Sequence, residues 1–228
     1  MNASVFGCAR CGALYPERVA FCSSCGSFDS LSLQSSRSAD SLWRQGGECL
    51  SALDLLKRST SGLTSESYPA LRIGREAIVA IYGPPGAGKS TLLYKFLDGM
   101  TGDVLLLSIE EGFADTVIDR LKRLEIHRSD FHLGYVRSVE EIGDLVQKHN
   151  PVAVGIDSLT MTTLTTDDVM RLSSFIGGPL LFTLHVTKDG APAGAMTVLH
   201  ASDVVVRVEG MKWALEKSRF SGSITGEV

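Results

Sequence analysis

The sequence predicts an α/β domain built around a mostly parallel sheet. From residue 77 onward, short and nearly unbroken apolar segments alternate with segments whose apolar residues recur at helical spacing. Strands that are buried on both faces have such unbroken apolar runs, and the helices between them cover the two faces. A glycine-rich segment directly after the first apolar run supports the same fold, because ligand-binding loops follow a strand in this architecture. The predicted strands are residues 77–82, 104–109, 152–156 and 180–184.

Two helices are predicted between these strands from the spacing of their apolar residues. The second helix begins at a capping-box spacing, since Ser138 and Glu141 stand three residues apart and each can satisfy a free backbone N–H. The two apolar series are Val117, Ile118, Leu121 and Leu124, and then Val139, Ile142 and Val146.

The end of the chain predicts three short strands separated by tight turns. Glu209-Gly210 and Ser221-Gly222 are turn-forming pairs, and apolar residues crowd the segments beside them. We expect these strands to add an antiparallel extension to the sheet. They span residues 204–208, 213–217 and 223–228.

The first part of the chain has a different composition and predicts a separate module. Residues 1–30 hold four paired cysteines, residues 31–48 are rich in serine and form a linker, and residues 49–228 form the α/β domain. A length of 228 residues is enough for one full α/β domain with a small appended module. Ahead of the first strand, residues 50–57 have helical periodicity and residues 59–67 favour turns.

The paired cysteines predict a zinc ribbon. Two C-x2-C turns separated by ten residues each point two thiolates at one Zn2+ ion and complete a tetrahedral shell. Zinc binding, worth roughly 10 to 16 kcal/mol in comparable peptides, would supply the folding energy of a module too small to bury a core. The alternatives are two disulfides or unliganded thiols, and Cys49 is interpreted as a small apolar residue outside the pattern. The four zinc ligands are Cys8, Cys11, Cys22 and Cys25.

Composition and charge limit the cell compartments and the kinds of partner that this sequence fits. No apolar run approaches the roughly 20 residues that a membrane span requires, and Met1–Arg10 lacks the features of a secretory signal. Paired cysteines also suit a reducing compartment, so we expect a cytoplasmic protein without a membrane partner. The formal net charge of -4 argues against a surface coated with nucleic-acid-binding charge, although subunit assembly can still create a local basic track.

A complete phosphate-binding loop follows the first predicted strand. Residues 83–90 match G-x-x-x-x-G-K-[ST], for which a chance match has odds on the order of one percent or less. The strand before the loop and the helix after it aim backbone N–H groups and a helix dipole at a pyrophosphate. Lys89 is expected to reach the β- and γ-phosphates, Ser90 to coordinate Mg2+, and Thr91 to approach the α-phosphate. The loop consists of Gly83, Pro84, Pro85, Gly86, Ala87, Gly88, Lys89 and Ser90.

A second magnesium contact is predicted at the end of another apolar strand. Asp157 directly follows the run Ala153–Ile156 and would hold Mg2+ directly or through water. The alternative is a helix cap or a turn residue, which is the commoner role of an aspartate that ends a strand. The phosphate loop in the same chain favours the magnesium role.

Two adjacent glutamates supply candidates for the group that activates water. Glu110 and Glu111 follow the strand 104–109, at the carboxyl edge of the sheet where ligands bind in this architecture. Hydrolysis needs a group that orients or deprotonates water near the γ-phosphate, and Glu110 is our choice. Alternatively, both glutamates begin the next helix, where the dipole favours negative charge. The residues alone leave these two interpretations even.

With these motifs in place, nearly the whole chain resembles the bacterial RadA/Sms family, RecA-fold ATPases of recombination and repair that carry a zinc ribbon. The resemblance implies a RecA-like core that binds ATP, Mg2+ and Zn2+, acts on single-stranded or branched DNA and assembles into a ring or filament. It also points to a replicative helicase or a recombinase as a partner. The segments that carry it are the cysteine ribbon with Tyr15-Pro16 in its spacer, the phosphate loop, Ser108–Glu111, Ile156–Ser158, Leu184–Gly194 and Lys217–Phe220.

The resemblance also assigns roles to individual residues. Glu110 matches the catalytic glutamate of the family. His185 follows an apolar strand, where it would detect the γ-phosphate and pass its loss to the loop 186–194. Lys217 and Arg219 match a Lys-x-Arg-Phe segment and would reach a neighbouring subunit's ATP, an arrangement worth roughly 10³ to 10⁵ in rate. Without the rest of the pattern, both cations would be interpreted as a solvated strand face.

Three features depart from the family pattern. The family continues into a protease-like, ring-forming domain, whereas this sequence ends at Val228, which puts the stability of a hexamer in doubt. The stretch 158–178 is shorter than the family's DNA-contacting segment and contains Asp167-Asp168 with a single arginine, so DNA binding is less secure than ATP binding. Ser218 and Ser221 replace the usual asparagine and glycine of the Lys-Asn-Arg-Phe-Gly segment, which keeps its charges but alters its turn.

Three functions are compatible with these residues. The leading hypothesis is an enzyme of DNA recombination or repair that hydrolyses ATP at a subunit interface and couples it to strand remodelling or branch migration. The second is a RecA-fold regulatory ATPase that acts on another protein. The third is a nucleotide-gated adaptor whose zinc ribbon docks a partner and whose turnover is negligible. Salt-sensitive stimulation by single-stranded DNA would favour the first, and slow hydrolysis unchanged by Glu110→Gln would favour the third.

Overall fold

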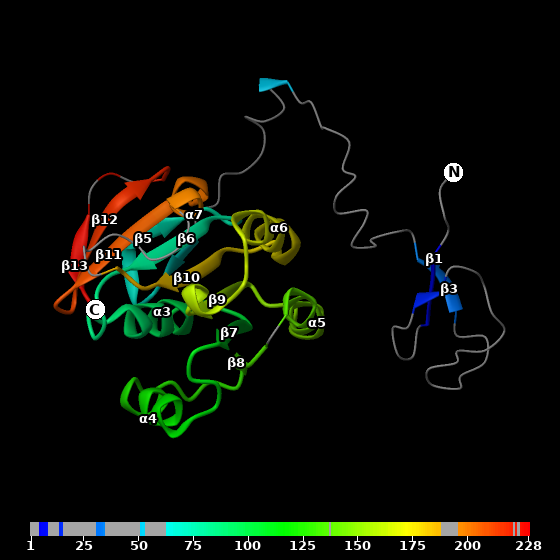
Figure 1. Cartoon of the computed structure of the whole chain (residues 1–228), viewed down its shortest axis with the longest axis horizontal. Helices are drawn as coiled ribbons and strands as arrows, with labels where there is room; N and C mark the ends of the chain where they lie inside the picture. Colours follow the sequence, from blue (N-terminus) through cyan, green and yellow to red (C-terminus); the bar gives the residue numbers. More distant parts are fainter. Residues whose placement is uncertain are drawn as a thin grey trace. The chain divides into compact units, whose positions relative to one another are not determined.

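The computed structural model divides the chain into two compact units, Met1–Arg58 and Ser59–Val228 (Figure 1). It describes residues 5–8, 14–15, 31–34, 51–52, 63–136, 138–187, 196–220, 222 and 224–228. The helix predicted at residues 50–57 and most of the loop 186–194 lie outside these residues, so both stay predictions.

The described part of the first unit is a three-stranded antiparallel sheet. β1 (Val5–Cys8) is the central strand, between β2 (Leu14–Tyr15) and β3 (Leu31–Gln34). β3 lies in the stretch 31–48 that the sequence assigned to a linker, and its pairing with β1 carries the sheet of this unit past residue 30.

The second unit is built on an eight-stranded sheet of described strands in the order β13-β12-β11-β6-β10-β9-β7-β8. The strands from β11 to β8 are parallel to one another, and β12 and β13 are antiparallel at one edge. The predicted α/β fold is therefore confirmed, and β11, which is parallel to β6 and antiparallel to β12, joins the predicted antiparallel extension to the parallel strands. The strands are β6 (Ile78–Tyr82), β7 (Val104–Ser108), β8 (Phe131–Gly134), β9 (Ala153–Asp157), β10 (Leu180–Leu184), β11 (Val204–Glu209), β12 (Lys212–Ser218) and β13 (Thr225–Glu227).

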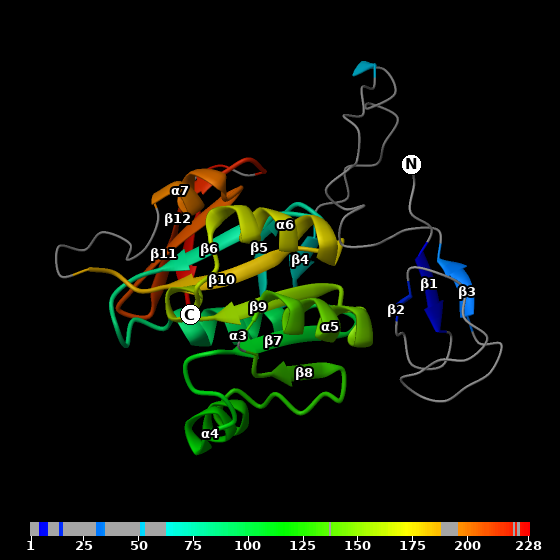
Figure 2. The same ribbon diagram turned by 45° about the vertical axis from the view of Figure 1, so that its right-hand side comes forward.

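Helices cover both faces of this sheet, with α3 below it and α6 and α7 above it in Figure 1. Figure 2 shows α4 beyond β8, at the end of the sheet opposite to β13. The Ser138 hydroxyl accepts the Glu141 N–H at 3.3 Å and starts α5, as its spacing predicted. The helices are α3 (Lys89–Asp98), α4 (Asp115–Arg123), α5 (Val139–His149), the short 3-10 helix η1 (Leu159–Met161), α6 (Thr166–Ile176) and α7 (Met196–Ala201).

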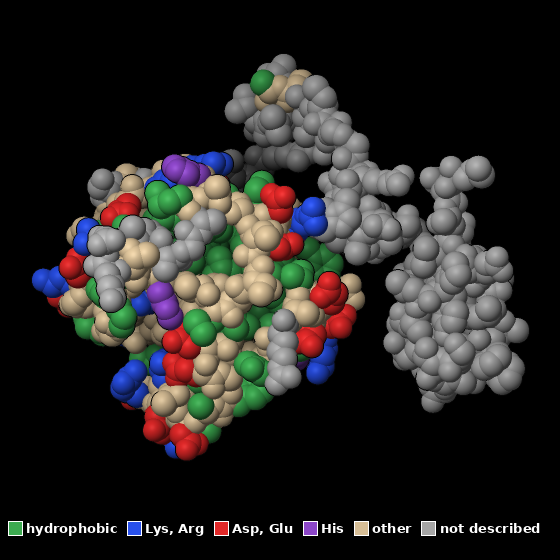
Figure 3. Space-filling model, viewed as in Figure 1, with side chains coloured by type: hydrophobic (Ala, Val, Ile, Leu, Met, Phe, Trp, Pro, Cys, Tyr) green, Lys and Arg blue, Asp and Glu red, His purple; other side chains and the backbone are tan. Residues whose placement is uncertain are grey.

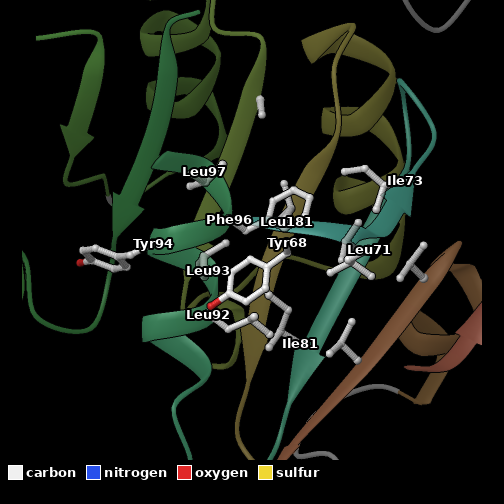
Figure 4. Packing of buried hydrophobic residues seen from close by; sticks show 14 of the residues in the cluster. Tyr68, Leu71, Ile73, Ile81, Leu92, Leu93, Tyr94, Phe96, Leu97 and Leu181 are labelled. Atoms are coloured by element: carbon white, nitrogen blue, oxygen red, sulfur yellow. The ribbon is translucent and has the colours of Figure 1, made fainter. Parts of the chain in front are cut away.

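A hairpin that the sequence did not predict packs against α3. It consists of β4 (Leu63–Ser65) and β5 (Tyr68–Ile73), so within the described part of the predicted turn-forming stretch 59–67 only residues 66–67 form a turn. The ring of Tyr68 stacks on Phe96 of α3 with centroids 6.4 Å apart, and Leu71 and Ile73 enter the same core (Figure 4). The hairpin thereby fixes α3, the helix that follows the phosphate loop.

Candidate nucleotide-binding site

The phosphate loop connects β6 to α3, as its motif requires. Gly83 approaches β11 so closely that a Cβ on it would lie 2.0 Å from the Val208 carbonyl oxygen. Gly88, the residue before α3, has a φ of 106°, a conformation that favours glycine. The loop therefore presents backbone N–H groups at the first turn of α3, where an anion is favoured by the helix dipole.

Lys89 is held inside this loop. Its side chain is largely buried and its Nζ donates to the Pro84 carbonyl oxygen at 2.9 Å. Burial lowers the pKa of the Lys89 ammonium group, and the nearby charges of Asp157 and Glu110 oppose that shift. A cation held inside the loop and bonded there to a neutral carbonyl oxygen is suited to bind phosphate oxygens.

Asp157 lies next to the phosphate loop at the tip of β9. Its carboxylate accepts a hydrogen bond from Thr183 of β10 at 2.6 Å, and the Ser90 hydroxyl is near enough to stabilise its negative charge. Burial raises the pKa of Asp157, while the hydroxyls of Thr183 and Ser90 counteract that effect. Hydroxyl and carboxylate oxygens are the hard ligands that Mg2+ prefers, so Ser90 and Asp157 fit a magnesium site.

Glu110 and His185 meet beside this site. The Nε2 atom of His185 lies 3.1 Å from a carboxylate oxygen of Glu110, and both side chains keep about a third or more of their surface exposed. The backbone N–H of Glu110 donates to the Asp157 carbonyl oxygen at 3.2 Å, which ties the glutamate to the tip of β9. The contact between Glu110 and His185 was not predicted, because their positions are 75 residues apart in the sequence.

Glu111 has different partners from its neighbour. Its carboxylate accepts from Arg120 of α4 at 2.7 Å and from the Thr116 hydroxyl. Burial opposes ionisation, but these hydrogen bonds lower the pKa of Glu111 below its ordinary value. The Arg120 guanidinium also lies over the ring of Tyr94, 5.2 Å from its centroid. Neither glutamate lies in a helix, because α4 begins at residue 115.

A cleft of about 770 Å³ brings these groups together at the carboxyl edge of the sheet. The phosphate loop, the residues at or just after the ends of β7, β9 and β10, and the helices α3 and α4 all contribute residues to its lining. Its lining residues are Pro85, Gly86, Gly88, Lys89, Ser90, Thr91, Lys95, Glu110, Glu111, Arg120, Arg123, Leu124, Asp157, His185, Met211 and Val228.

Lys217 and Arg219 lie at the opposite edge of the sheet. β12 runs antiparallel to the strands beside it, so its last residues are at the amino ends of the parallel strands. The Nζ atom of Lys217 donates to the carbonyl oxygens of Leu199 at 3.3 Å and His200 at 2.8 Å. Arg219 pairs with Asp203 at 3.0 Å and is 62% exposed. In the described part of the chain, neither cation lines the nucleotide cleft.

The zinc ligands fall almost entirely outside the described residues. Cys8 is the last residue of β1, whereas Cys11, Cys22 and Cys25 are not described. Among the residues that the structure describes, no cluster of histidine, cysteine or acidic side chains has the arrangement of a metal site. The zinc ribbon therefore stays a prediction.

The fold and the site together define a P-loop ATPase domain with a RecA-like fold. A phosphate loop joins a buried parallel strand to a helix, and an aspartate at the tip of another strand faces the loop's serine. Residues 75–175 match the family model described as AAA domain, which agrees with this class.

Within that class, the chain is similar to bacterial proteins named DNA repair protein RadA. It is 28% identical to the protein of Bacillus subtilis, over 91% of this chain and 52% of that relative. The protein of Pseudomonas aeruginosa is 25% identical over 90% of this chain, and that of Campylobacter jejuni is 26% identical over 92%. The chain spans about half the length of these curated relatives. The resemblance that the motifs indicated is therefore confirmed.

None of the described helices combines the length and the apolar character that crossing a membrane would require.

Proposed function

We propose that this protein is a Mg2+-dependent ATPase that hydrolyses ATP between two copies of the chain and couples hydrolysis to the remodelling of single-stranded or branched DNA in the cytoplasm. The observation that carries the proposal is the convergence of Lys89, Ser90, Asp157 and Glu110 in one cleft on the phosphate loop. Resemblance to proteins named for DNA repair supports the choice of DNA as the substrate.

The residues of the cleft divide the chemistry among them. Lys89 and the backbone N–H groups of the loop bind the β- and γ-phosphates. Ser90 and Asp157 would hold Mg2+, which supplies positive charge against the phosphate oxygens. Glu110 orients the attacking water and accepts its proton, and its contact with His185 fixes the carboxylate. Because Glu111 is engaged by Arg120 and Thr116, Glu110 is the glutamate whose carboxylate remains available for water.

A second copy would complete this site. Lys217 and Arg219 lie at the edge of the sheet away from their own cleft, so contact with ATP requires that they approach the cleft of a neighbour. Arginine at that position would neutralise charge that develops on the γ-phosphate. This arrangement favours a ring or filament of chains.

DNA binding depends on cations contributed by several copies. Figure 3 shows acidic and basic side chains interspersed over the face of the second unit in view. α6 begins with Asp167 and Asp168, which disfavour a phosphate backbone at its start.

The test is ATP hydrolysis with and without single-stranded DNA at two salt concentrations, together with the mass of the protein in ATP. We expect DNA to raise turnover, and the gain to shrink at high salt because counterions compete for the same cations. Glu110→Gln protein is the control for contaminating ATPases. Hydrolysis that DNA does not change at either salt concentration would contradict DNA coupling and favour a protein target.

We also propose that the four cysteines hold a structural zinc ion. Removing zinc with a chelator should make residues 1–30 sensitive to protease while the ATPase domain stays resistant. A protease pattern that chelation does not alter would argue for disulfides or for free thiols.

A further inference from the structure

The turn between β11 and β12 touches the phosphate loop. Gly210 and Met211 form this turn, and both have positive φ values, of 56° and 62°. The Met211 N–H donates to the Ala87 carbonyl oxygen at 3.1 Å, and its sulfur lies against Gly88. The start of β12 is therefore bound to the loop that surrounds the phosphates.

A second contact, between β12 and the strand before the phosphate loop, lies further along β12. The Tyr82 hydroxyl donates to the Glu216 carboxylate at 2.5 Å. Tyr82 is the last residue of β6, directly before the phosphate loop, and Glu216 directly precedes Lys217. Burial first, and then the hydrogen bond and charge of Glu216, raise the pKa of Tyr82 to about 12. The hydroxyl therefore keeps its proton and remains a donor at physiological pH.

The local shape of β12 serves this contact. Leu215 pairs with Val206 and Lys217 pairs with Val205, so Glu216 is an extra residue in the ladder between β11 and β12. A bulge of this kind bends a strand and redirects the side chain at that position. Here it coincides with the one residue of β12 that accepts a hydrogen bond from the phosphate-loop strand, among the contacts of the described residues.

The first residue of β6 is linked to Arg219 through the carboxylate of Asp203. One carboxylate oxygen of Asp203 accepts the N–H of Ile78, the first residue of β6, at 2.9 Å, and the other pairs with Arg219 at 3.0 Å. β6 is thus linked to the segment 216–219 near both of its ends, directly through Tyr82 and indirectly through Asp203.

We propose that Tyr82 and Glu216 are positioning residues that set the placement of Lys217 and Arg219 according to the state of the chain's own phosphate loop. This proposal rests on the proposed function, in which those cations act on a neighbour's ATP. A chain whose own loop is displaced would then present its cations poorly to the next chain. Successive sites in an assembly would be coupled through β6 and β12.

The experiment mixes two inactive variants, so that an active site forms only where the cleft of one variant meets the arginine of the other. Chains carrying Arg219→Ala keep an intact cleft but lack the arginine, and chains carrying Glu110→Gln lack the base but keep the arginine. Tyr82→Phe, which removes one hydroxyl and keeps the ring, is then added to either kind of chain. Full-length chains are used, and kcat and KM for ATP are measured in each mixture.

We expect Tyr82→Phe to lower the kcat of the mixture about tenfold when it is in the arginine-donating chain, because a small misplacement of a charged group is costly. KM should not change. In the chain that donates the cleft, the same substitution should change kcat less than about twofold, since Tyr82 does not line the cleft. Glu216→Ala should repeat this pattern, and Glu216→Gln, which keeps an acceptor oxygen, should restore most of the activity.

Tyr68→Phe is the matched control. The Tyr68 hydroxyl is buried and has no hydrogen-bond partner among the described residues, so its removal should have no effect in either chain. Equal losses from Tyr82→Phe in both placements, or no loss in either, would overturn the positioning role alone. If Arg219→Ala and Glu110→Gln chains do not rescue each other at all, the shared site itself is wrong, and the positioning role falls with it.

Discussion

The two edges of the sheet both carry charged residues, but those at one edge line a cleft and those at the other bond to groups of their own chain. At the carboxyl edge, Lys89, Asp157 and Glu110 converge on a cleft large enough for a nucleotide. At the amino edge, Lys217 and Arg219 lie near the surface, and each is bound to oxygen atoms of its own chain. The first edge is arranged around a cleft within one chain, whereas the cations of the second edge do not line that cleft.

The difference between the edges teaches how one domain can hold two halves of different sites. A parallel sheet places all its strand ends of one kind at one edge, which gathers the phosphate loop and the acidic tips. An added antiparallel strand, β12, starts at that edge and ends at the other. It therefore connects the phosphate loop, which Met211 contacts, with the segment that carries Lys217 and Arg219.

The largest expected effect is a loss of turnover that distinguishes the role of the amino edge from that of the carboxyl edge. Arg219→Ala should lower turnover on the order of a thousandfold and leave ATP affinity unchanged, because the arginine acts only on a neighbour's transition state. ATP affinity by calorimetry and steady-state hydrolysis are the two measurements. Arg207→Ala removes another exposed arginine, which pairs with Glu209 at 2.8 Å, and serves as the control. A comparable fall in ATP affinity would place Arg219 in its own chain's site.

Glu110→Gln tests the chemistry of the carboxyl edge. We expect binding to persist and hydrolysis to fall about a hundredfold or more, the usual contribution of a general base. Single-turnover hydrolysis measures the chemical step. Glu111→Gln should lower it far less, because Glu111 binds Arg120 and Thr116. The opposite ranking would make Glu111 the base.

Lys89→Ala tests the phosphate loop itself. ATP affinity should fall by about two orders of magnitude, because the charged hydrogen bonds from the Lys89 ammonium group to the phosphates are lost. Equilibrium binding of a fluorescent ATP analogue measures the loss. Lys122→Ala, on the exposed side of α4, provides a neutral comparison. Tight ATP binding by the Lys89 variant would refute the nucleotide site.

The smallest expected effect concerns the stability that Glu111 contributes at the carboxyl edge. Glu111→Gln should lower the free energy of unfolding by about 1 kcal/mol at neutral pH, since it weakens charged hydrogen bonds. The folded-state pKa of Glu111 lies below its ordinary value of 4.5, so its contribution is complete above that value and is lost as the pH falls through the lowered pKa. Urea unfolding should show a difference in the free energy of unfolding between variant and parent at neutral pH, and this difference should disappear in acid. A difference that persists in acid would mean that packing is responsible.

Much of this architecture could be predicted from apolar runs, because strands buried on both faces are almost uninterrupted. β8 was missed since residues such as His132 and Gly134 break its apolar character, and the β4–β5 hairpin was hidden by the serines beside it. The predicted antiparallel pairing of β11 with β12 is present, whereas its parallel pairing with β6 was not predicted, because the sequence of a strand does not state which neighbours it pairs with.

The site could be predicted only where one segment carries the whole motif. The phosphate loop is such a segment, and Ser90 and Asp157 follow from it. Contacts between distant residues, such as Thr183 with Asp157, need the fold. A threonine within the apolar run 180–184 was the available signal for that contact, because a buried hydroxyl requires a partner.

The bonds that Lys217 and Arg219 make within their own chain have a consequence for dilute protein. In the proposed arrangement, these cations leave the carbonyls of α7 and the Asp203 carboxylate only when a phosphate offers a stronger attraction. Chains without nucleotide would then associate weakly, and bound ATP would strengthen their association. The rate of hydrolysis per chain would accordingly rise steeply with protein concentration. Conversion of ATP to ADP would weaken the contact between the two chains.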